Sequence, residues 1–301
     1  MNEKLYQKEF KSFLTLEKAL SDNTITAYIS DLKKLSVYAL HLDPPRTVMN
    51  ISRDELKGFI MDIHDIGMSE RTQARIISSL KAFYRFLLIE EISNHDPTEN
   101  LDTPRIKRKL PDTISVNEIN ELVGAIDLSR DDGYRNKAII ETLYSCGLRV
   151  SELINLKLSK IYFKERFVRV IGKGNKERLV PIGSQALEHI VNYIENTRSH
   201  QKIKIGHEDF LFINRLGKGI SRVMIFNIVK QLATKINLGK NISPHTFRHS
   251  FATHLIEGGA DLRAVQEMLG HESITTTEIY THLDREYLRD AIIQFHPRSR
   301  K

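Results

Sequence analysis

The second half of this 301-residue chain carries polar side chains whose types can hold and cut a phosphodiester. They are two arginines, a lysine, two histidines and a tyrosine: Arg149, Lys173, His245, Arg248, His271 and Tyr280. Arginine offers paired donors to phosphate oxygens, and histidine adds another donor. A tyrosine hydroxyl can act as a nucleophile and form a covalent intermediate. Together these residues predict phosphodiester cleavage without a metal ion and without a cofactor.

Two of these residues are expected in the first turn of one helix. Ser243 caps a helix predicted over residues 244–258, and His245 and Arg248 lie three positions apart on one face of it. The N-terminal end of a helix attracts anions. A zinc site is the alternative, because His245 and His249 are four apart, but no glutamate follows His245 as in metalloprotease helices.

The other candidates are expected at the starts of helices and in turns. Arg149 begins a short helix, and we expect Glu152, three residues on, to support it by an ion pair. Lys173 lies in a Gly-Lys-Gly turn between predicted strands 166–171 and 177–182, at the tip of a hairpin. Taken alone, Arg149 and Glu152 would be interpreted as an exposed surface pair, and Lys173 as an exposed lysine in a turn.

The nucleophile candidate is expected beyond a glycine turn. Leu269 and Gly270 end a helix at His271, and a short polar helix containing Tyr280 is predicted to begin at Ser273. Such a tyrosine can be partly exposed, whereas a core tyrosine is the alternative. The single cysteine, Cys146, is expected to be a small buried residue.

The elements that position these residues form two groups. Helices alone are predicted over residues 2–19, from Asn23, from Ser52 and over 69–92. A proline-containing linker follows, and a second capping box at Ser115 opens a mostly helical region with one hairpin. The sequence therefore predicts a mainly α protein with an N-terminal four-helix domain (1–103), a linker (104–112) and a mostly helical α/β domain (113–301).

The charge distribution indicates a polyanionic partner. The net charge is +7, with 14 basic and 16 acidic residues up to Arg105 and 31 basic and 22 acidic residues after it. Candidate phosphate contacts on the fourth helix are Arg71, Arg75, Lys81 and Arg85, and those in the linker are Arg105, Lys107, Arg108 and Lys109. A solvated helix face and a plain solvated linker are the alternatives.

Composition excludes several other classes of protein. The 41% hydrophobic and 28% charged residues are typical of a soluble globular protein, and no apolar run approaches the length of a membrane span. The N-terminal residues show no signal-peptide pattern, and one cysteine excludes an internal disulfide. We therefore expect a cytoplasmic protein with no membrane insertion.

Read together, the candidate segments resemble the tyrosine recombinase (phage integrase) family, and within it the Xer (XerC/XerD) type. The resemblance covers nearly the whole chain, and its motifs are Gly147–Leu153, Gly172–Arg178, His245–Leu255, Leu269–His271 and Tyr280–His282. It implies a SAM-like core-binding domain followed by a catalytic domain. It also implies a double-stranded DNA recombination site as substrate.

The resemblance assigns roles to the candidates. Tyr280 would form a 3′-phosphotyrosyl enzyme, and Lys173 would protonate the leaving 5′ oxygen. His271 would bond the phosphate or assist the tyrosine's deprotonation, and the non-bridging oxygens would be held by Arg149, His245 and Arg248. Four copies, of this chain or with a paralogue, would act on two duplexes, with a tail (285–301) docking on the neighbouring subunit. An FtsK-type DNA translocase is a further expected partner.

Three other functions fit parts of the pattern. An integrase of a phage or mobile element would share the chemistry, but many carry an extra DNA-binding domain, which we do not expect here. A type IB topoisomerase would relax DNA without a target site. A catalytically silent DNA-binding regulator would not need the six candidate residues. We expect instead a Xer-type role in resolving chromosome dimers.

Overall fold

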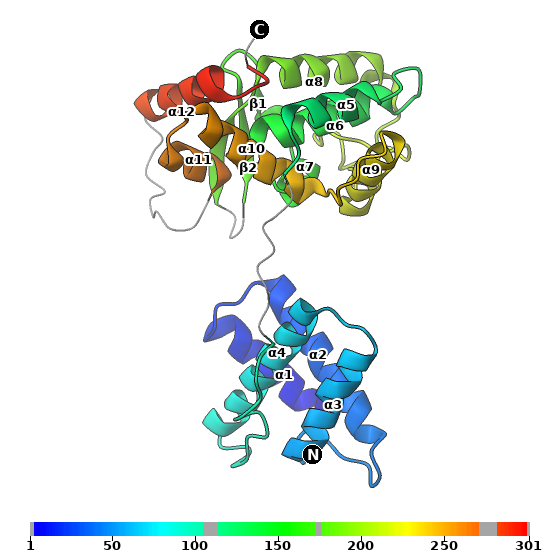
Figure 1. The fold of residues 1–301 in the computed structure, drawn as a ribbon, viewed down its shortest axis with the longest axis vertical. Helices are drawn as coiled ribbons and strands as arrows, with labels where there is room; N and C mark the ends of the chain where they lie inside the picture. The colour runs from blue at the N-terminus through cyan, green and yellow to red at the C-terminus, as the bar shows by residue number, and fades with distance from the viewer. Residues whose placement is uncertain (1–2, 105–112, 173–175, 271–281, 300–301) are drawn as a thin grey trace. The chain divides into compact units, whose positions relative to one another are not determined.

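The computed structural model describes residues 3–104, 113–172, 176–270 and 282–299. The chain divides into two compact units, residues 1–109 and 110–301, each with its own hydrophobic core. Figure 1 shows both units.

The N-terminal unit is a group of four helices, as the sequence predicts. They are α1 (Glu3–Leu16), α2 (Asp22–Leu40), α3 (Arg53–Asp65) and α4 (Glu70–Ile89). An aromatic cluster joins α1 to α4, because the Phe10 ring lies 5.2 Å from that of Phe83 and 5.5 Å from that of Phe86. All three rings are buried, which gives this unit an independent core.

The predicted helix starts are confirmed at two of the three N-caps in this unit. Ser52 forms the expected capping box with Glu55, and Ser69 accepts a hydrogen bond from the backbone of Thr72. The predicted cap of α2, Asn23, is wrong. Ser21 is the N-cap, because its hydroxyl accepts from the backbone N–H of Thr24, three residues on.

The C-terminal unit places a small sheet among helices. Its elements are α5 (Val116–Gly124), α6 (Gly133–Cys146), α7 (Val150–Ile154), β1 (Ile161–Tyr162), β2 (Phe167–Ile171), β3 (Glu177–Pro181), α8 (Ser184–Asn196), α9 (Arg222–Lys235), α10 (Pro244–Gly258), α11 (Leu262–Leu269) and α12 (His282–Phe295). Two 3-10 turns, Leu158–Lys160 and Arg198–His200, connect them.

The predicted hairpin of β2 and β3 is present, with Val170 opposite Arg178. A third strand, β1, which the sequence did not indicate, pairs antiparallel with β2, so the sheet order is β1-β2-β3. Only two residues of β1 pair, Ile161 with Val168 and Tyr162 with Phe167. So short a segment shows no period-2 pattern.

The helix α10 lies at the centre of this unit. It packs against α6, α9, α11 and α12 and buries Phe247 and Phe251 completely. Gly147 ends α6 in the left-handed conformation (φ 56°), and a β-carbon there would meet the Phe251 ring at 2.4 Å. Only glycine therefore allows the end of α6 to approach α10 this closely.

The last helix and the residues after it pack on their own unit. Leu288, Ala291 and Ile292 of α12 belong to the core, and His296 is fully buried. The guanidinium of Arg298 donates to the Glu141 carboxylate on α6 at 2.9 Å. The tail that we expected to dock on a neighbour thus has an anchorage within its own chain.

Cys146 is buried, as expected, and burial raises the pKa of its thiol. Among the helices that the structure describes, none has the length and apolar character required to cross a bilayer.

Candidate active site

A buried carboxylate, that of Glu152, is the centre of the predicted site. Its side chain is 1% exposed and lies in the first turn of α7. It accepts four hydrogen bonds, from the backbone N–H and Nη1 of Arg149 and from Nη1 and Nη2 of Arg178, at 2.8–2.9 Å. These bonds occupy the acceptor positions of both oxygens.

Arg149 occupies the position that the sequence predicts, paired with Glu152. Its Nη1 lies 2.9 Å from Glu152 Oε1, and its Nη2 donates to the carbonyl oxygen of Gly270 at 3.2 Å. The side chain remains 32% exposed. The ion pair is confirmed, and about a third of the Arg149 side chain stays accessible.

Arg248 reaches the same carboxylate from α10. Its Nη1 lies 3.9 Å from Glu152 Oε2 and donates to the carbonyl oxygen of Gly147 at 2.8 Å, and Nη2 donates to that of Leu269. Burial, followed by the charge of Arg149, lowers the pKa of Arg248 to about 10. The guanidinium therefore stays charged at neutral pH.

Arg178 is the member of this group that sequence reasoning missed. It lies on β3, is 7% exposed, and donates Nε to the carbonyl oxygen of Met268 at 2.8 Å besides pairing with Glu152. Its strand neighbour Val180 is buried on the same face. A charged residue at an inward position of an alternating strand was the available signal.

The three guanidiniums meet at the C-terminal end of α11. The last four carbonyls of α11 belong to residues 266–269. The N–H of Gly270 donates to the first two of these carbonyls, those of Gln266 and Glu267. The next three carbonyls accept from one arginine each: Met268 from Arg178, Leu269 from Arg248 and Gly270 from Arg149. Helix-end carbonyls favour cations, so this end of α11 gathers the arginines.

Arg149, Arg178, Arg248 and Glu152 together form the arginine cluster. Three guanidiniums and one carboxylate leave two unbalanced positive charges. Burial raises the pKa of Glu152, but the hydrogen bonds and charge of Arg178, followed by the hydrogen bonds from Arg149, outweigh it and hold this pKa below its usual value. Such a cluster suits an anion that carries one or two charges.

His245 lies in the first turn of α10, three residues before Arg248. Its side chain is exposed and has no hydrogen-bond partner among the described residues. In that part of the chain no three His, Cys, Asp or Glu residues come together as metal ligands would. His245 is thus accessible to a ligand at the N-terminal end of this helix.

Several predicted residues lie outside the described part of the chain. They are the catalytic candidates Lys173, His271 and Tyr280 and the linker residues Arg105, Lys107, Arg108 and Lys109. In sequence, His271 directly follows Gly270, whose carbonyl accepts from Arg149, and Lys173 directly follows Gly172, the first residue after β2.

The four basic residues predicted on α4 do not share one environment. At 100° per residue they fall within roughly 120° of the helix circumference. Arg71 and Arg85 are exposed and Lys81 is half-buried. Arg75, however, forms an ion pair with Asp31 of α2, whose side chain is fully buried, and donates to the carbonyl of Ala27. Arg75 therefore links two helices.

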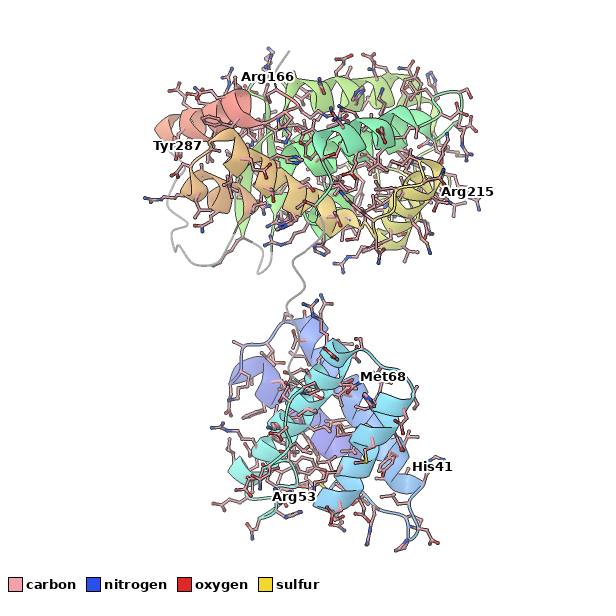
Figure 2. All side chains as sticks on the ribbon, in the orientation of Figure 1. His41, Arg53, Met68, Arg166, Arg215 and Tyr287 are labelled. Carbon is pink, nitrogen blue, oxygen red and sulfur yellow. The ribbon has the colours of Figure 1, made fainter. Side chains whose placement is uncertain are left out.

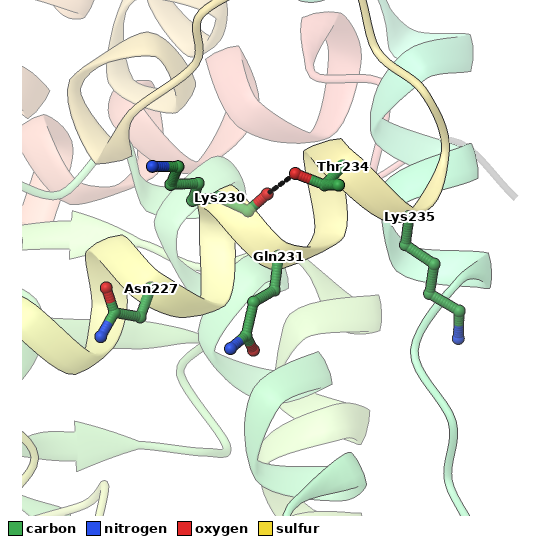
Figure 3. A pocket seen from close by; sticks show the side chains of 5 residues that line it. All are labelled: Asn227, Lys230, Gln231, Thr234 and Lys235. Carbon is green, nitrogen blue, oxygen red and sulfur yellow. Dashed lines mark hydrogen bonds between the residues drawn. The ribbon is translucent and has the colours of Figure 1, made fainter.

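A shallow hollow on α9 is separate from the arginine cluster. Figure 3 shows the exposed side chains that line it, Asn227, Lys230, Gln231, Thr234 and Lys235. The dashed bond in that view is the Thr234 hydroxyl donating to the carbonyl of Lys230 at 3.1 Å. No member of the cluster lines this hollow.

Comparison with known proteins decides the family. Residues 112–286 match the phage integrase family, and residues 8–91 match the phage integrase N-terminal SAM-like domain. The chain belongs to the phage integrase family of tyrosine recombinases. It is therefore a site-specific recombinase, and the two matches confirm the predicted mainly α, two-domain fold class.

Relatives of this recombinase match over nearly its whole length. The tyrosine recombinase XerD of Staphylococcus saprophyticus is 44% identical over 292 residues, 97% of this chain and 98% of the relative. XerD of Halalkalibacterium halodurans is 42% identical over 292 residues, 97% of each chain. Among family members, this recombinase is thus similar to the Xer type.

Solved structures share its fold. The XerH site-specific recombinase bound to its difH substrate has a TM-score of 0.68 and 25% identity, covering 86% of this chain and 76% of that one. A lambda integrase dimer bound to a core site has a TM-score of 0.70 and 16% identity, covering 96% and 78%. The first structure shows DNA bound by a recombinase of this fold.

Proposed function

We propose that this recombinase cleaves and rejoins DNA through a covalent 3′-phosphotyrosyl intermediate. The Tyr280 oxygen attacks the scissile phosphorus while the bond from phosphorus to the 5′ oxygen breaks. Lys173 gives the leaving 5′ oxygen a proton, and His271 bonds the phosphate or accepts the proton of the tyrosine. Rejoining reverses these steps with another 5′ hydroxyl, so the phosphotyrosyl bond replaces ATP as the energy store.

The arginine cluster is the observation that supports this proposal. Arg149 and Arg248 hold the non-bridging oxygens, whose charge rises from one to about two in the transition state, with His245 as a further donor. The two unbalanced positive charges of the cluster match the negative charge that the phosphate reaches in the transition state. Donors that are already fixed by Glu152 and by the end of α11 need little reorganisation during the reaction.

The decisive experiment is covalent trapping on a nicked suicide duplex that carries the candidate chromosomal site, with EDTA present. We compare the wild type with Tyr280→Phe. An adduct that resists denaturation in the wild type alone supports a tyrosine nucleophile that needs no metal ion. An adduct of equal yield in Tyr280→Phe would refute the assignment of Tyr280.

We further propose a Xer-type role in resolving chromosome dimers in the cytoplasm. The recombinase acts on a double-stranded DNA site as a tetramer on two duplexes, with itself or a paralogue, and answers to an FtsK-type translocase. The similarity to XerD relatives over nearly the whole chain supports this role. Recombination of a two-site plasmid, with and without the translocase, tests both the reaction and the activator.

The proposed DNA contacts outside the active site are the basic residues of α4 and of the linker (104–112). Arg71, Lys81 and Arg85 are accessible on α4, while the pairing of Arg75 makes it a lesser contributor. Each phosphate contact that is lost should reduce the slope of log affinity against log salt by about 0.9.

We also propose that the tail (285–301) docks on a neighbouring subunit in the assembled complex. Its core face is used within its own chain, so docking would use its exposed residues or an exchange of the tail. Tyr287, labelled in Figure 2, and Ile293 are 47% and 40% exposed. Because truncation after Leu283 removes core residues, Ile293→Asp is the better test, and unchanged cooperative binding would refute the proposal.

A further inference from the structure

Arg178 makes contacts beyond those that would be needed to hold the strand β3 in place. Its guanidinium uses Nη1 and Nη2 on the two Glu152 oxygens, at 2.8 and 2.9 Å, and Nε on the carbonyl of Met268 at 2.8 Å. The residue is 7% exposed, so it does not itself offer a surface to DNA. Its fork geometry fits both oxygens of one carboxylate, which a lysine cannot do.

Through Glu152, Arg178 acts on both arginines that are proposed to hold the phosphate. Oε1 of this carboxylate accepts from Arg149 Nη1 at 2.9 Å, and Oε2 lies 3.9 Å from Arg248 Nη1. Arg178 occupies one acceptor position on each oxygen, which leaves one on Oε1 for Arg149 Nη1 and one on Oε2 for the backbone N–H of Arg149. Without Arg178, the buried carboxylate would have two free acceptor positions to draw Arg149 and Arg248 away from a ligand.

Arg178 also lies at the base of the β2–β3 hairpin. The N–H of Gly172 bonds the carbonyl of Lys176 at 2.8 Å and closes the hairpin. A β-carbon on Gly172 would lie 3.5 Å from Arg178 Nη1 and 3.7 Å from Glu152 Oε1. The hairpin therefore leaves the sheet directly beside the arginine cluster, with the Arg178–Glu152 pair as its support.

On the other side, Arg178 fits against the end of α11. Gly270 ends that helix in the left-handed conformation (φ 64°), and a β-carbon there would meet three atoms of the Arg178 side chain at 3.2 Å. Together with the bond to the Met268 carbonyl, this packing fixes the carbonyls of Leu269 and Gly270, to which Arg248 and Arg149 donate.

We propose that Arg178 is a positioning residue for strand cleavage, which aligns the guanidiniums of Arg149 and Arg248 on the scissile phosphate by holding Glu152 and the end of α11. This inference rests on the proposed phosphotyrosyl function. It predicts that Arg178 affects the chemical step rather than the affinity for DNA.

The test compares full-length wild type, Arg178→Lys and Arg178→Met with a control, Arg135→Lys. Arg135 is also buried in this unit, pairs with Asp132 and donates to the carbonyl of Ile213, but it contacts no member of the arginine cluster. For each protein we measure the dissociation constant for the uncleaved site, the urea unfolding midpoint and the single-turnover rate of adduct formation. Two nicked duplexes are used, one with a phosphodiester and one with a methylphosphonate at the scissile position.

The methylphosphonate separates positioning from folding. It replaces a charged non-bridging oxygen by a methyl group, so misplaced guanidiniums matter less for its cleavage. We expect Arg178→Lys to bind DNA within about threefold of wild type but to cleave the phosphodiester about 100-fold more slowly. On the methylphosphonate the deficit should fall to about tenfold or less. Arg135→Lys should show equal effects on both substrates.

Each other outcome overturns the inference. A cleavage rate of Arg178→Lys within about threefold of wild type would remove any role in alignment. An equal deficit on both substrates, or a deficit that follows the loss of folded protein, would make Arg178 a structural cross-link only. Arg178→Lys keeps the charge, so this comparison holds even if Arg178→Met does not fold. If wild type forms no adduct on either duplex, the proposed function fails, and the inference fails with it.

Discussion

At the level of single residues, the arginine cluster depends on one carboxylate in an otherwise cationic environment. Glu152 is reached from three elements, by Arg149 before α7, Arg178 on β3 and Arg248 on α10. Three guanidiniums so close together would repel one another without it. The carboxylate therefore offsets this repulsion and leaves a surplus of positive charge on the arginines.

Glu152→Ala should accordingly be strongly destabilising, because it leaves the buried guanidinium of Arg178 without its partner. We expect a loss of about 3–5 kcal/mol in the free energy of unfolding, measured by urea denaturation. Glu152→Gln keeps the shape and two acceptor lone pairs and should cost less. A loss below about 1 kcal/mol for Glu152→Ala would contradict the central place of this pair.

The lowered pKa of Glu152 gives this stabilisation a pH dependence. A carboxyl group whose folded pKa lies below its unfolded value contributes stability above the unfolded value, and this contribution is lost as the pH falls through the folded pKa. Wild type should therefore lose stability as the pH falls below about 4.3. Glu152→Gln, measured by the same urea titrations, should lack this component, and identical profiles would argue against it.

At the level of elements, the basic residues of α4 separate into two groups. Arg75 compensates the buried charge of Asp31 on α2, with Lys34 at 3.2 Å from the same carboxylate. Arg71 and Arg85, on the same side of α4, are exposed. Helix periodicity placed them together, but the neighbouring helix decides which of them is available to DNA.

Arg75→Ala should lower the free energy of unfolding by about 1–3 kcal/mol, because Asp31 loses a partner in a buried position. Arg71→Ala and Arg85→Ala should change it by less than about 0.5 kcal/mol. Those two variants should instead weaken DNA binding with a reduced salt slope. Thermal unfolding and binding titrations at several salt concentrations measure the two effects, and equal destabilisation by all three would contradict this division.

The C-terminal segment contains a buried titratable group, His296. Its ring packs on those of Tyr144 and Phe251, and its Nδ1 accepts from the backbone N–H of Arg298 at 3.1 Å. Burial, followed by the charges of Arg298 and His254, lowers the pKa of His296 to about 3. The folded chain therefore holds a neutral imidazole at this position.

The sign of the pH effect follows from that shift. Between about 6.5 and 3 the unfolded chain binds the proton that the folded chain excludes, so stability falls with falling pH. The contribution of the neutral His296 ring to the free energy of unfolding is complete above pH 6.5. Within this pH window it falls by about 1.4 kcal/mol for each unit of falling pH. His296→Leu should flatten the pH profile of the urea midpoint between pH 6.5 and 4, and an unchanged slope would contradict the assignment.

At the level of the whole molecule, the two compact units have separate cores. The N-terminal core is built on Phe10, Phe83 and Phe86, and the C-terminal core on α6, α10 and the sheet. Each unit thus buries apolar surface without help from the other. We therefore predict that each unit folds independently.

Residues 1–109 and 110–301, produced separately, should each unfold cooperatively in urea. The second unit should keep the arginine cluster and form the adduct, with weaker DNA binding because the basic face of α4 is absent. Circular dichroism and the suicide-duplex assay test the two statements. An unfolded 110–301 fragment would show that its core needs the first unit.

The sequence by itself determined what depends on near neighbours along the chain. The capping boxes at Ser52 and Ser115 and the Arg149–Glu152 pair all join residues three positions apart, so helical geometry alone brings them together. The order of helices and the β2–β3 hairpin follow from periodicity in the same way.

Tertiary structure alone decided the contacts between distant segments. Arg178 is 26 residues from Glu152 and 90 from Met268, and Arg75 is 44 from Asp31. No local period encodes such pairs, because they exist only once the packing of two elements has fixed the distance and direction between their side chains. The sequence therefore indicated Arg149, Arg248 and Glu152 as residues of the proposed site. The packing of α7, α10, α11 and β3 added Arg178 and joined all four residues in one charged cluster.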